Sequence, residues 1–124
     1  MPTALVVEDS LTDKEIITGF LRQQGINFIV AQNAEEAFDK VKNNQLDLII
    51  LDVILPDRSG YEICRDLKDE MVTRKIPVLI CSTKGTDIDK FWGMKQGADA
   101  YLAKPLDQVD FVDTIQKLLG LSFK

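Results

Sequence analysis

Residues 48–52 read LIILD, four apolar side chains followed at once by a carboxylate. Three further apolar runs of the chain end in the same way, on the polar residues Glu8-Asp9, Ser82 and Lys104. Short apolar runs bounded by polar or turn residues are typical of buried parallel strands. In an open α/β sheet, ligands bind outside the carboxyl ends of the strands. The pattern therefore predicts that three carboxylates, a hydroxyl and an ammonium group converge at one edge of a parallel sheet.

The acidic side chains at this edge have an electrostatic consequence. The carboxylates of Glu8, Asp9 and Asp52 would repel one another unless something cationic lay among them. A divalent cation held by hard oxygen ligands is the simplest solution. The sequence therefore predicts a metal site of this kind at the strand ends.

Composition limits the class of protein. The chain has 124 residues, of which 45% are hydrophobic, and this suits one globular domain with a single core. Its formal net charge of −5 argues against a surface built to contact nucleic-acid phosphates. The absence of histidine excludes a Cys/His metal site and a Ser-His-Asp or Cys-His catalytic arrangement. Of the two cysteines, Cys64 and Cys81, the second falls in a predicted buried strand and is expected to be a free thiol.

Strand-like and helical segments alternate along the whole chain. Apolar runs predict strands near residues 4–7, 28–31, 48–51, 78–81 and 100–102. Helical periodicity fills the segments between them, where Asn33 and Glu36 stand at capping-box spacing and Asp107 begins the last helix. This order predicts an α/β fold with a doubly wound (βα)5 sheet of five parallel strands, of the flavodoxin-like kind.

The domain organisation follows from the same alternation. No linker, repeat or low-complexity segment interrupts it, so residues 1–124 are expected to form one domain without an output domain. Met1-Pro2 leads directly into the first strand, which predicts that there is no signal peptide. The apolar runs are too short to span a bilayer, so we expect a cytosolic protein without membrane insertion.

A family resemblance rests on the residues at the four strand ends, Glu8-Asp9, Asp52, Ser82 and Lys104-Pro105. In this order, on a (βα)5 pattern, they resemble the receiver domain of two-component response regulators, the CheY-like family. The resemblance covers the whole chain. The segment LPDRSG at 55–60 is similar to the loop after the family's phosphorylated aspartate, and GAD at 97–99 is similar to the segment before its last strand.

The resemblance implies a role for each strand-end residue. Asp52 is the nucleophile that receives a phosphoryl group from a histidine kinase or a phosphotransfer protein and becomes an aspartyl phosphate. Mg²⁺, or Mn²⁺ in its place, is held by Asp9, Asp52 and the backbone carbonyl of Ile54. Glu8 acts on the metal through a bound water, because Mg²⁺ keeps several waters. Lys104 pairs with a phosphoryl oxygen as a point charge.

The resemblance also implies a switch. The hydroxyl of Ser82 is expected to bind the phosphoryl group after modification, and Tyr101 occupies the family's aromatic switch position. The Lys104–Pro105 peptide bond is expected to be cis. The surface that binds a downstream protein is expected over Thr86–Leu119, which comprises the fourth helix, the fifth strand and the fifth helix. We expect a monomer or a weak dimer.

The residues of the chain favour one function over several others. The segment from Ser82 to Ala98 is similar to single-domain receivers linked to twitching or pilus-driven motility, which favours a stand-alone response regulator that switches partner binding. A phosphatase of the haloacid-dehalogenase type would need a second aspartate two residues after Asp52, where Ile54 stands. A nucleotide-binding flavodoxin-like domain would need a Gly-rich loop after the first strand, and none follows it. A phosphate-independent interaction module with the receiver fold is the alternative.

Overall fold

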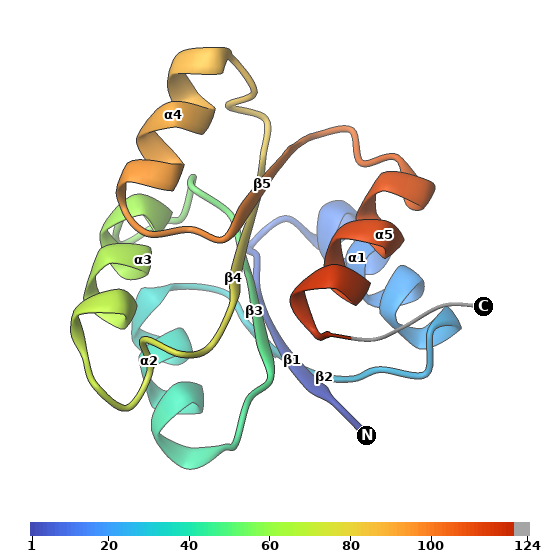
Figure 1. The fold of residues 1–124 in the computed structure, drawn as a ribbon, viewed down its shortest axis with the longest axis horizontal. Coiled ribbons are helices and arrows are strands. Elements are labelled where there is room, and N and C mark those ends of the chain that lie inside the picture. Colours follow the sequence, from blue (N-terminus) through green and yellow to red (C-terminus); the bar gives the residue numbers. More distant parts are fainter. Residues whose placement is uncertain (121–124) are drawn as a thin grey trace.

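The computed structural model describes residues 1–120 as a regular alternation of strands and helices (Figure 1). The elements are β1 (Thr3–Val7), α1 (Leu11–Gln23), β2 (Asn27–Ala31), α2 (Ala34–Asn43), β3 (Leu48–Leu51), α3 (Gly60–Asp69), β4 (Val78–Ser82), α4 (Asp87–Lys95), β5 (Ala100–Ala103) and α5 (Gln108–Leu118). Four strands begin or end one residue outside the predicted apolar runs, because flanking residues still join the sheet. Among residues 1–120, no helix is both long and apolar enough to cross a membrane.

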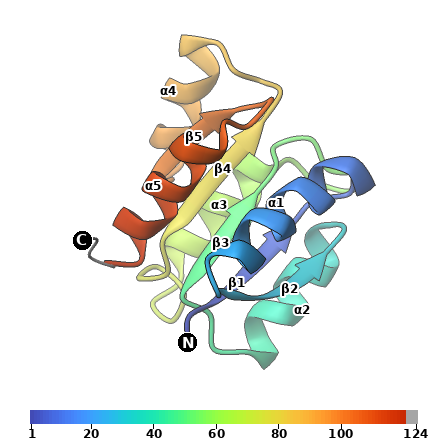
Figure 2. The same cartoon turned by 90° about the vertical axis from the view of Figure 1, so that its right-hand side faces the viewer.

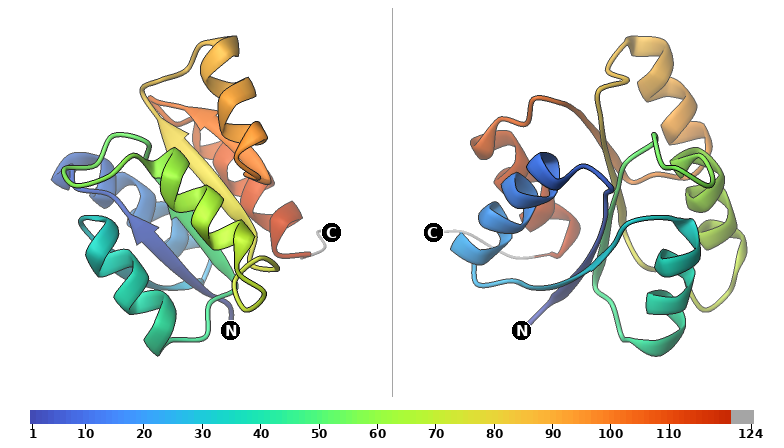
Figure 3. Two further views of the ribbon diagram at one scale, coloured as in Figure 1. Left: turned by 90° about the vertical axis from the view of Figure 1, so that its left-hand side faces the viewer. Right: turned by 180° about the vertical axis from the view of Figure 1, so that it is seen from behind.

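The five strands form one parallel sheet in the order β2-β1-β3-β4-β5. Helices α1 and α5 cover one face of the sheet, and α2, α3 and α4 cover the other (Figures 2 and 3). The predicted doubly wound, flavodoxin-like fold is therefore confirmed. The chain moves outward from β1 to β2 and then returns past β1 to β3, so the strand order reverses at β1. Ligands of such sheets bind at the carboxyl edge beside this reversal.

The strands β3 and β4 are buried along their whole length. Their sequences show no alternation of apolar and polar residues because helices cover both faces of the sheet. On one face, Phe111 and Ile115 of α5 share a cluster with Ile17 and Leu21 of α1, and Ile63 of α3 lies in the cluster on the other face. Full burial of one such side chain contributes about 1.5–3 kcal/mol. These contacts between the helices and the sheet fix the positions of the strand ends.

Polar residues fix where the helices begin. Asn33 caps α2 by accepting a hydrogen bond from the backbone N–H of Glu36 at 2.8 Å. The carboxylate of Glu36, however, accepts from the N–H of Gln32 at 2.9 Å, so only half of the capping box is present. A complete capping box lies instead at α4, between Thr86 and Asp89. One such cap stabilises a helix by about 1 kcal/mol, and this one fixes the start of the helix that follows Ser82.

Candidate functional site

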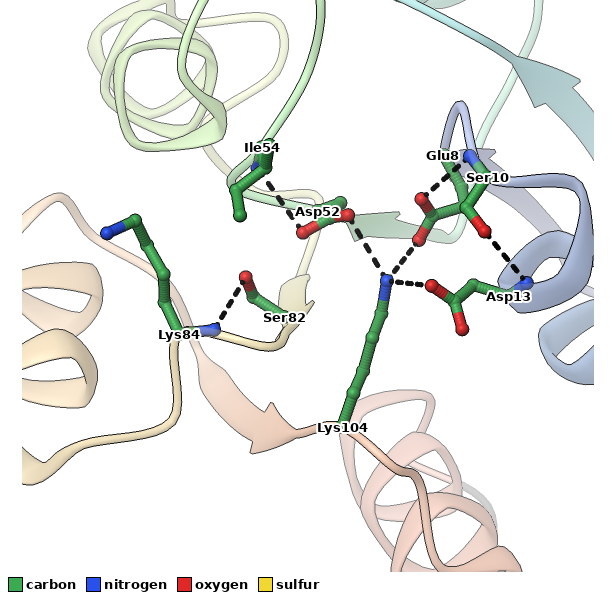
Figure 4. A network of polar contacts seen from close by, with 8 residues as sticks. All are labelled: Glu8, Ser10, Asp13, Asp52, Ile54, Ser82, Lys84 and Lys104. Atoms are coloured by element: carbon green, nitrogen blue, oxygen red, sulfur yellow. Dashed lines mark hydrogen bonds and ion pairs between the residues drawn. The ribbon is translucent and has the colours of Figure 1, made fainter.

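The ends of four strands bring the predicted residues to one edge of the sheet (Figure 4). Glu8 directly follows β1 and Asp52 directly follows β3, where the N–H of Asp52 donates to the carbonyl of Val7 at 3.1 Å. Ser82 ends β4, and its carbonyl accepts from the N–H of Lys104 at 2.9 Å. Backbone hydrogen bonds between neighbouring strands therefore set the spacing of these side chains.

The ammonium group of Lys104 lies at the centre of the site. Its Nζ donates to Oε1 of Glu8 at 2.6 Å, to Oδ2 of Asp13 at 2.9 Å and to Oδ2 of Asp52 at 3.1 Å (Figure 4). An ammonium group has three N–H donors, so all of them are used. The side chain of Lys104 is only 5% exposed, which limits the access of water. The chain itself thus supplies a cation among the crowded carboxylates.

Burial controls the protonation of Glu8, whose side chain is 1% exposed. Burial raises the pKa of Glu8 to about 7, although the hydrogen bond from Lys104 lowers it. The charge of Asp52 also raises this pKa. For Lys104, burial by itself lowers the pKa, but the bonds to Glu8 and Asp13 and the charge of Asp52 outweigh it, so the pKa is raised. Lys104 therefore stays charged, whereas Glu8 titrates near neutral pH.

The loop after β3 fixes the orientation of Asp52. The Asp52 side chain is 9% exposed, and its Oδ1 accepts from the N–H of Ile54 at 3.3 Å. The N–H of Gly60 donates to the carbonyl of Val53 at 2.8 Å and closes the loop onto the strand end. A Cβ at position 60 would collide with the carbonyl oxygen of Asp52, so this close approach requires glycine. The loop therefore presents the carboxylate at the sheet edge in one orientation.

Of the oxygen donors predicted to bind a metal, the carboxylates of Glu8 and Asp52 contact the lysine. Glu8 and Asp52 are buried, Asp9 is exposed, and Ile54 contributes its backbone to the loop after β3. Carboxylate and carbonyl oxygens are the ligands that Mg²⁺ prefers, so the chemistry of the donor set fits this ion. Within residues 1–120, however, no three acidic or thiol side chains gather in the geometry of a metal centre. A cation at this site would compete with Lys104 for Glu8 and Asp52.

Ser82 and Tyr101 lie on adjacent strands beside the loop that leads into α4. The register of β4 and β5 pairs Ser82 with Ala103 and Ile80 with Tyr101. The Oγ of buried Ser82 accepts from the N–H of Lys84 at 3.2 Å. The Tyr101 hydroxyl donates to the carbonyl of Lys84 at 2.6 Å. The two predicted switch residues thus hold the same loop residue, one through its N–H and the other through its carbonyl.

Two contact residues were missed by the sequence analysis. Asp13, in the first turn of α1, completes the contacts of Lys104. The hydroxyl of Tyr61, on α3, donates to the carbonyl of Asp89 at 3.1 Å and lies 3.3 Å from the hydroxyl of Tyr101. An acid in the first turn of a helix is favourable for the helix dipole alone. The sequence position of Asp13 therefore gave no distinct signal of a role at the site.

Sequence comparison defines the class of protein. Residues 4–116 match the response regulator receiver domain family, and the chain belongs to this family. Receiver domains are the phosphoacceptor signalling modules of two-component systems. The resemblance inferred from the strand-end residues is confirmed. The Lys104–Pro105 peptide bond is cis in the structure.

Individual proteins match this chain over most of its own length. PilH of Pseudomonas aeruginosa is 33% identical over 120 residues, which cover 97% of this chain and 99% of PilH. Other curated relatives include transcriptional regulatory proteins, of which this chain spans about half the length. A response regulator structure from Chloroflexus aurantiacus superposes with a TM-score of 0.93 at 32% identity, covering 97% of this chain and 99% of that one. The receiver domain of a Pseudomonas aeruginosa sensor histidine kinase shares the fold, with a TM-score of 0.88 at 24% identity. The match covers 96% of this chain and 98% of that one. That structure was solved with magnesium coordinated in its active site cleft.

Proposed function

We propose that this protein is a stand-alone response regulator that accepts a phosphoryl group on Asp52 and then changes its binding to a downstream protein. The donor is a histidine kinase or a phosphotransfer protein. The observation that carries the proposal is the Asp52 carboxylate at the sheet edge, 3.1 Å from the Lys104 ammonium. The full-length match to PilH supports the stand-alone arrangement. The motility role expected from the segment between Ser82 and Ala98 is part of this proposal.

Phosphoryl transfer to Asp52 forms one bond and breaks another. A carboxylate oxygen of Asp52 attacks the phosphorus, the bond from phosphorus to the donor atom breaks, and the donor group leaves with the electron pair. Both reactants are anionic, so positioning and charge neutralisation supply most of the catalysis. Lys104 offers its ammonium to a phosphoryl oxygen, and Ser82 offers its hydroxyl to another.

The proposed metal site uses Asp9, Asp52 and the backbone carbonyl of Ile54, with Glu8 acting through a bound water. Mg²⁺, or Mn²⁺, supplies further neutralisation of the phosphoryl charge when it is bound. Glu8 assists in its ionised form, and the raised pKa of about 7 places this ionisation within the physiological range. The magnesium ion in the related receiver domain of a sensor histidine kinase supports this choice of cation.

Ser82 and Tyr101 connect the site with the proposed output surface, Thr86–Leu119. A bond from Ser82 to a phosphoryl oxygen shifts the hydroxyl that now holds Lys84, and Lys84 is also held by Tyr101. The loop containing Lys84 leads directly into α4. This helix exposes large apolar side chains, namely Ile88, Phe91, Trp92 and Met94. A gathering of such side chains on one helix is typical of a protein-binding surface.

Intact-mass analysis after incubation with acetyl phosphate and Mg²⁺ tests the proposal. The wild-type protein should gain one phosphoryl group, and Asp52→Asn should gain none. Asp113→Asn is the matched control, because Asp113 is an exposed aspartate on α5. Labelling that persists in Asp52→Asn would assign the phosphoryl group elsewhere. A wild-type protein that stays unmodified would favour the phosphate-independent interaction module.

The output surface is tested by NMR with beryllofluoride, which mimics the phosphoryl group. We expect amide shifts from Ser82 through α4 to Tyr101, because these residues share the loop around Lys84. Ser82→Ala should reduce these shifts, although intact-mass analysis should show that acetyl phosphate still phosphorylates Asp52 in this variant. Shifts confined to the loop after Asp52 would exclude signalling through Thr86–Leu119.

A further inference from the structure

We infer that Asp13 is a positioning residue for Lys104, which holds the ammonium group in the unmodified protein and releases it to the phosphoryl group. The inference rests on the proposed phosphorylation of Asp52 and adds a residue that lies outside the strand-end motifs. It starts from the distance of 2.9 Å between Oδ2 of Asp13 and Nζ of Lys104.

The start of α1 fixes the position of Asp13. Ser10 caps this helix, and its Oγ accepts from the N–H of Asp13 at 3.3 Å. The carboxylate points from the first turn toward the ammonium of Lys104, whose side chain comes from the end of β5 (Figure 4). The Asp13 side chain is 32% exposed, against 1% for Glu8 and 9% for Asp52. Asp13 is therefore the carboxylate of the three that water reaches best.

This difference in exposure decides which contact of Lys104 can be exchanged. All three N–H donors are bonded to carboxylates, so a bond to a phosphoryl oxygen requires one of them to be released. A buried carboxylate that loses its cationic partner is strongly destabilised, because water cannot replace that partner. The carboxylate of Asp13 can be hydrated instead. The Asp13 contact is thus the one that opens when Lys104 binds the phosphoryl group.

A contact that must open before the reaction slows it. In Asp13→Asn the side chain keeps its size and loses its charge, so Lys104 is held less tightly in the unmodified protein. We expect modification of Asp52 by acetyl phosphate to become about two- to fivefold faster, the range expected from a partly exposed ion pair. If Asp13 served only the helix N-terminus, where acids are favourable, the substitution would lower stability and leave the rate unchanged.

The test compares four proteins by intact-mass kinetics with acetyl phosphate and Mg²⁺: the wild type, Asp13→Asn, Asp13→Glu and Glu15→Gln. Glu15 is an exposed acid on the same helix, so Glu15→Gln controls for the change in net charge. NMR signals of the Lys104 methylene next to the ammonium, recorded without a phosphoryl donor, report the contact itself. We expect faster modification and shifted Lys104 signals in Asp13→Asn alone, with the other two variants close to the wild type.

Two kinetic results would overturn the inference. Equal acceleration in Glu15→Gln would mean that net charge alone matters, and an unchanged or slower rate in Asp13→Asn would remove Asp13 from the reaction. Failure of the proposed function gives a different result, because the wild-type protein then gains no phosphoryl group on Asp52. The Lys104 signals remain informative in that case, and signals unchanged by Asp13→Asn would again overturn the inference.

Discussion

The Gly93→Ala substitution tests how Tyr101 is held against α4. Gly93 is buried on this helix, and a Cβ there would lie 2.6 Å from Cδ2 and 2.7 Å from Cε2 of the tyrosine ring. Carbon atoms in contact are optimally separated by about 3.5–4.0 Å, so the ring has to move. Its movement takes the hydroxyl away from the carbonyl of Lys84, to which it donates at 2.6 Å.

Opposing effects decide the sign of the change in stability. Inside a helix, alanine is favoured over glycine by about 1 kcal/mol. Against this, overpacking a filled space costs about 1–3 kcal/mol, and loss of the hydrogen bond from Tyr101 to Lys84 costs about 1 kcal/mol. We therefore expect Gly93→Ala to lower the free energy of unfolding by about 1–3 kcal/mol.

Gly19→Ala is the matched control, because Gly19 lies inside α1 and a Cβ there would meet nothing within 4 Å. Urea unfolding followed by circular dichroism should show Gly19→Ala stabilised by up to about 1 kcal/mol and Gly93→Ala destabilised. In the background of Tyr101→Ala, which removes the ring, Gly93→Ala should lose most of its penalty. A stabilised Gly93→Ala protein, or a penalty that survives without the ring, would refute the reasoning.

Two further predictions concern the charges around Lys104. The pKa of Glu8 is about 7 in the folded protein against 4.5 for an ordinary Glu, so its contribution to stability is full below pH 4.5 and is lost as the pH rises through 7. Urea unfolding should show that the free energy of unfolding falls by about 1–3 kcal/mol between pH 4.5 and 8. The Glu8→Gln substitution should abolish this fall. An equally steep fall in that variant would implicate another titrating group. Lys104→Met leaves three carboxylates without their ammonium and should lower the free energy of unfolding at pH 8 by about 3–5 kcal/mol. Mg²⁺ should recover part of this loss in thermal unfolding, and a response no larger than that of the wild type would count against competition between the two cations.

The strand ends could be predicted because each depends on a local pattern. The run LIIL at 48–51 is apolar throughout because helices cover both faces of the sheet at that position. Parallel pairing then brings Asp52 to the same edge as Glu8, Ser82 and Lys104 without any knowledge of side-chain conformation. The phosphoacceptor and its neighbours therefore follow from the order of the runs and the residues that end them.

The contacts within the site could not be predicted in this way. The bonds of Lys104 depend on how α1 packs against the sheet, since this packing brings Asp13 within 2.9 Å of the ammonium. The role of Gly93 depends on where the ring of Tyr101 lies, because glycine inside a helix is by itself only a weak helix former. In both cases the decisive partner is far away in the sequence and makes its contact through a side chain.

The charge of the site explains why a stable fold keeps such an arrangement. With Glu8 ionised, the carboxylates of Glu8, Asp13 and Asp52 carry three negative charges and Lys104 carries one positive charge, which leaves −2. A mostly buried charge of this size is unfavourable. Burial raises the pKa of Glu8 to about 7, and the charge of Asp52 adds to this effect. The same charge favours binding of a divalent cation, and a neutralised site is what an incoming phosphoryl anion needs. An arrangement that served stability alone would replace one of these acids, so the excess of acids over cations is best explained by the proposed reaction at Asp52.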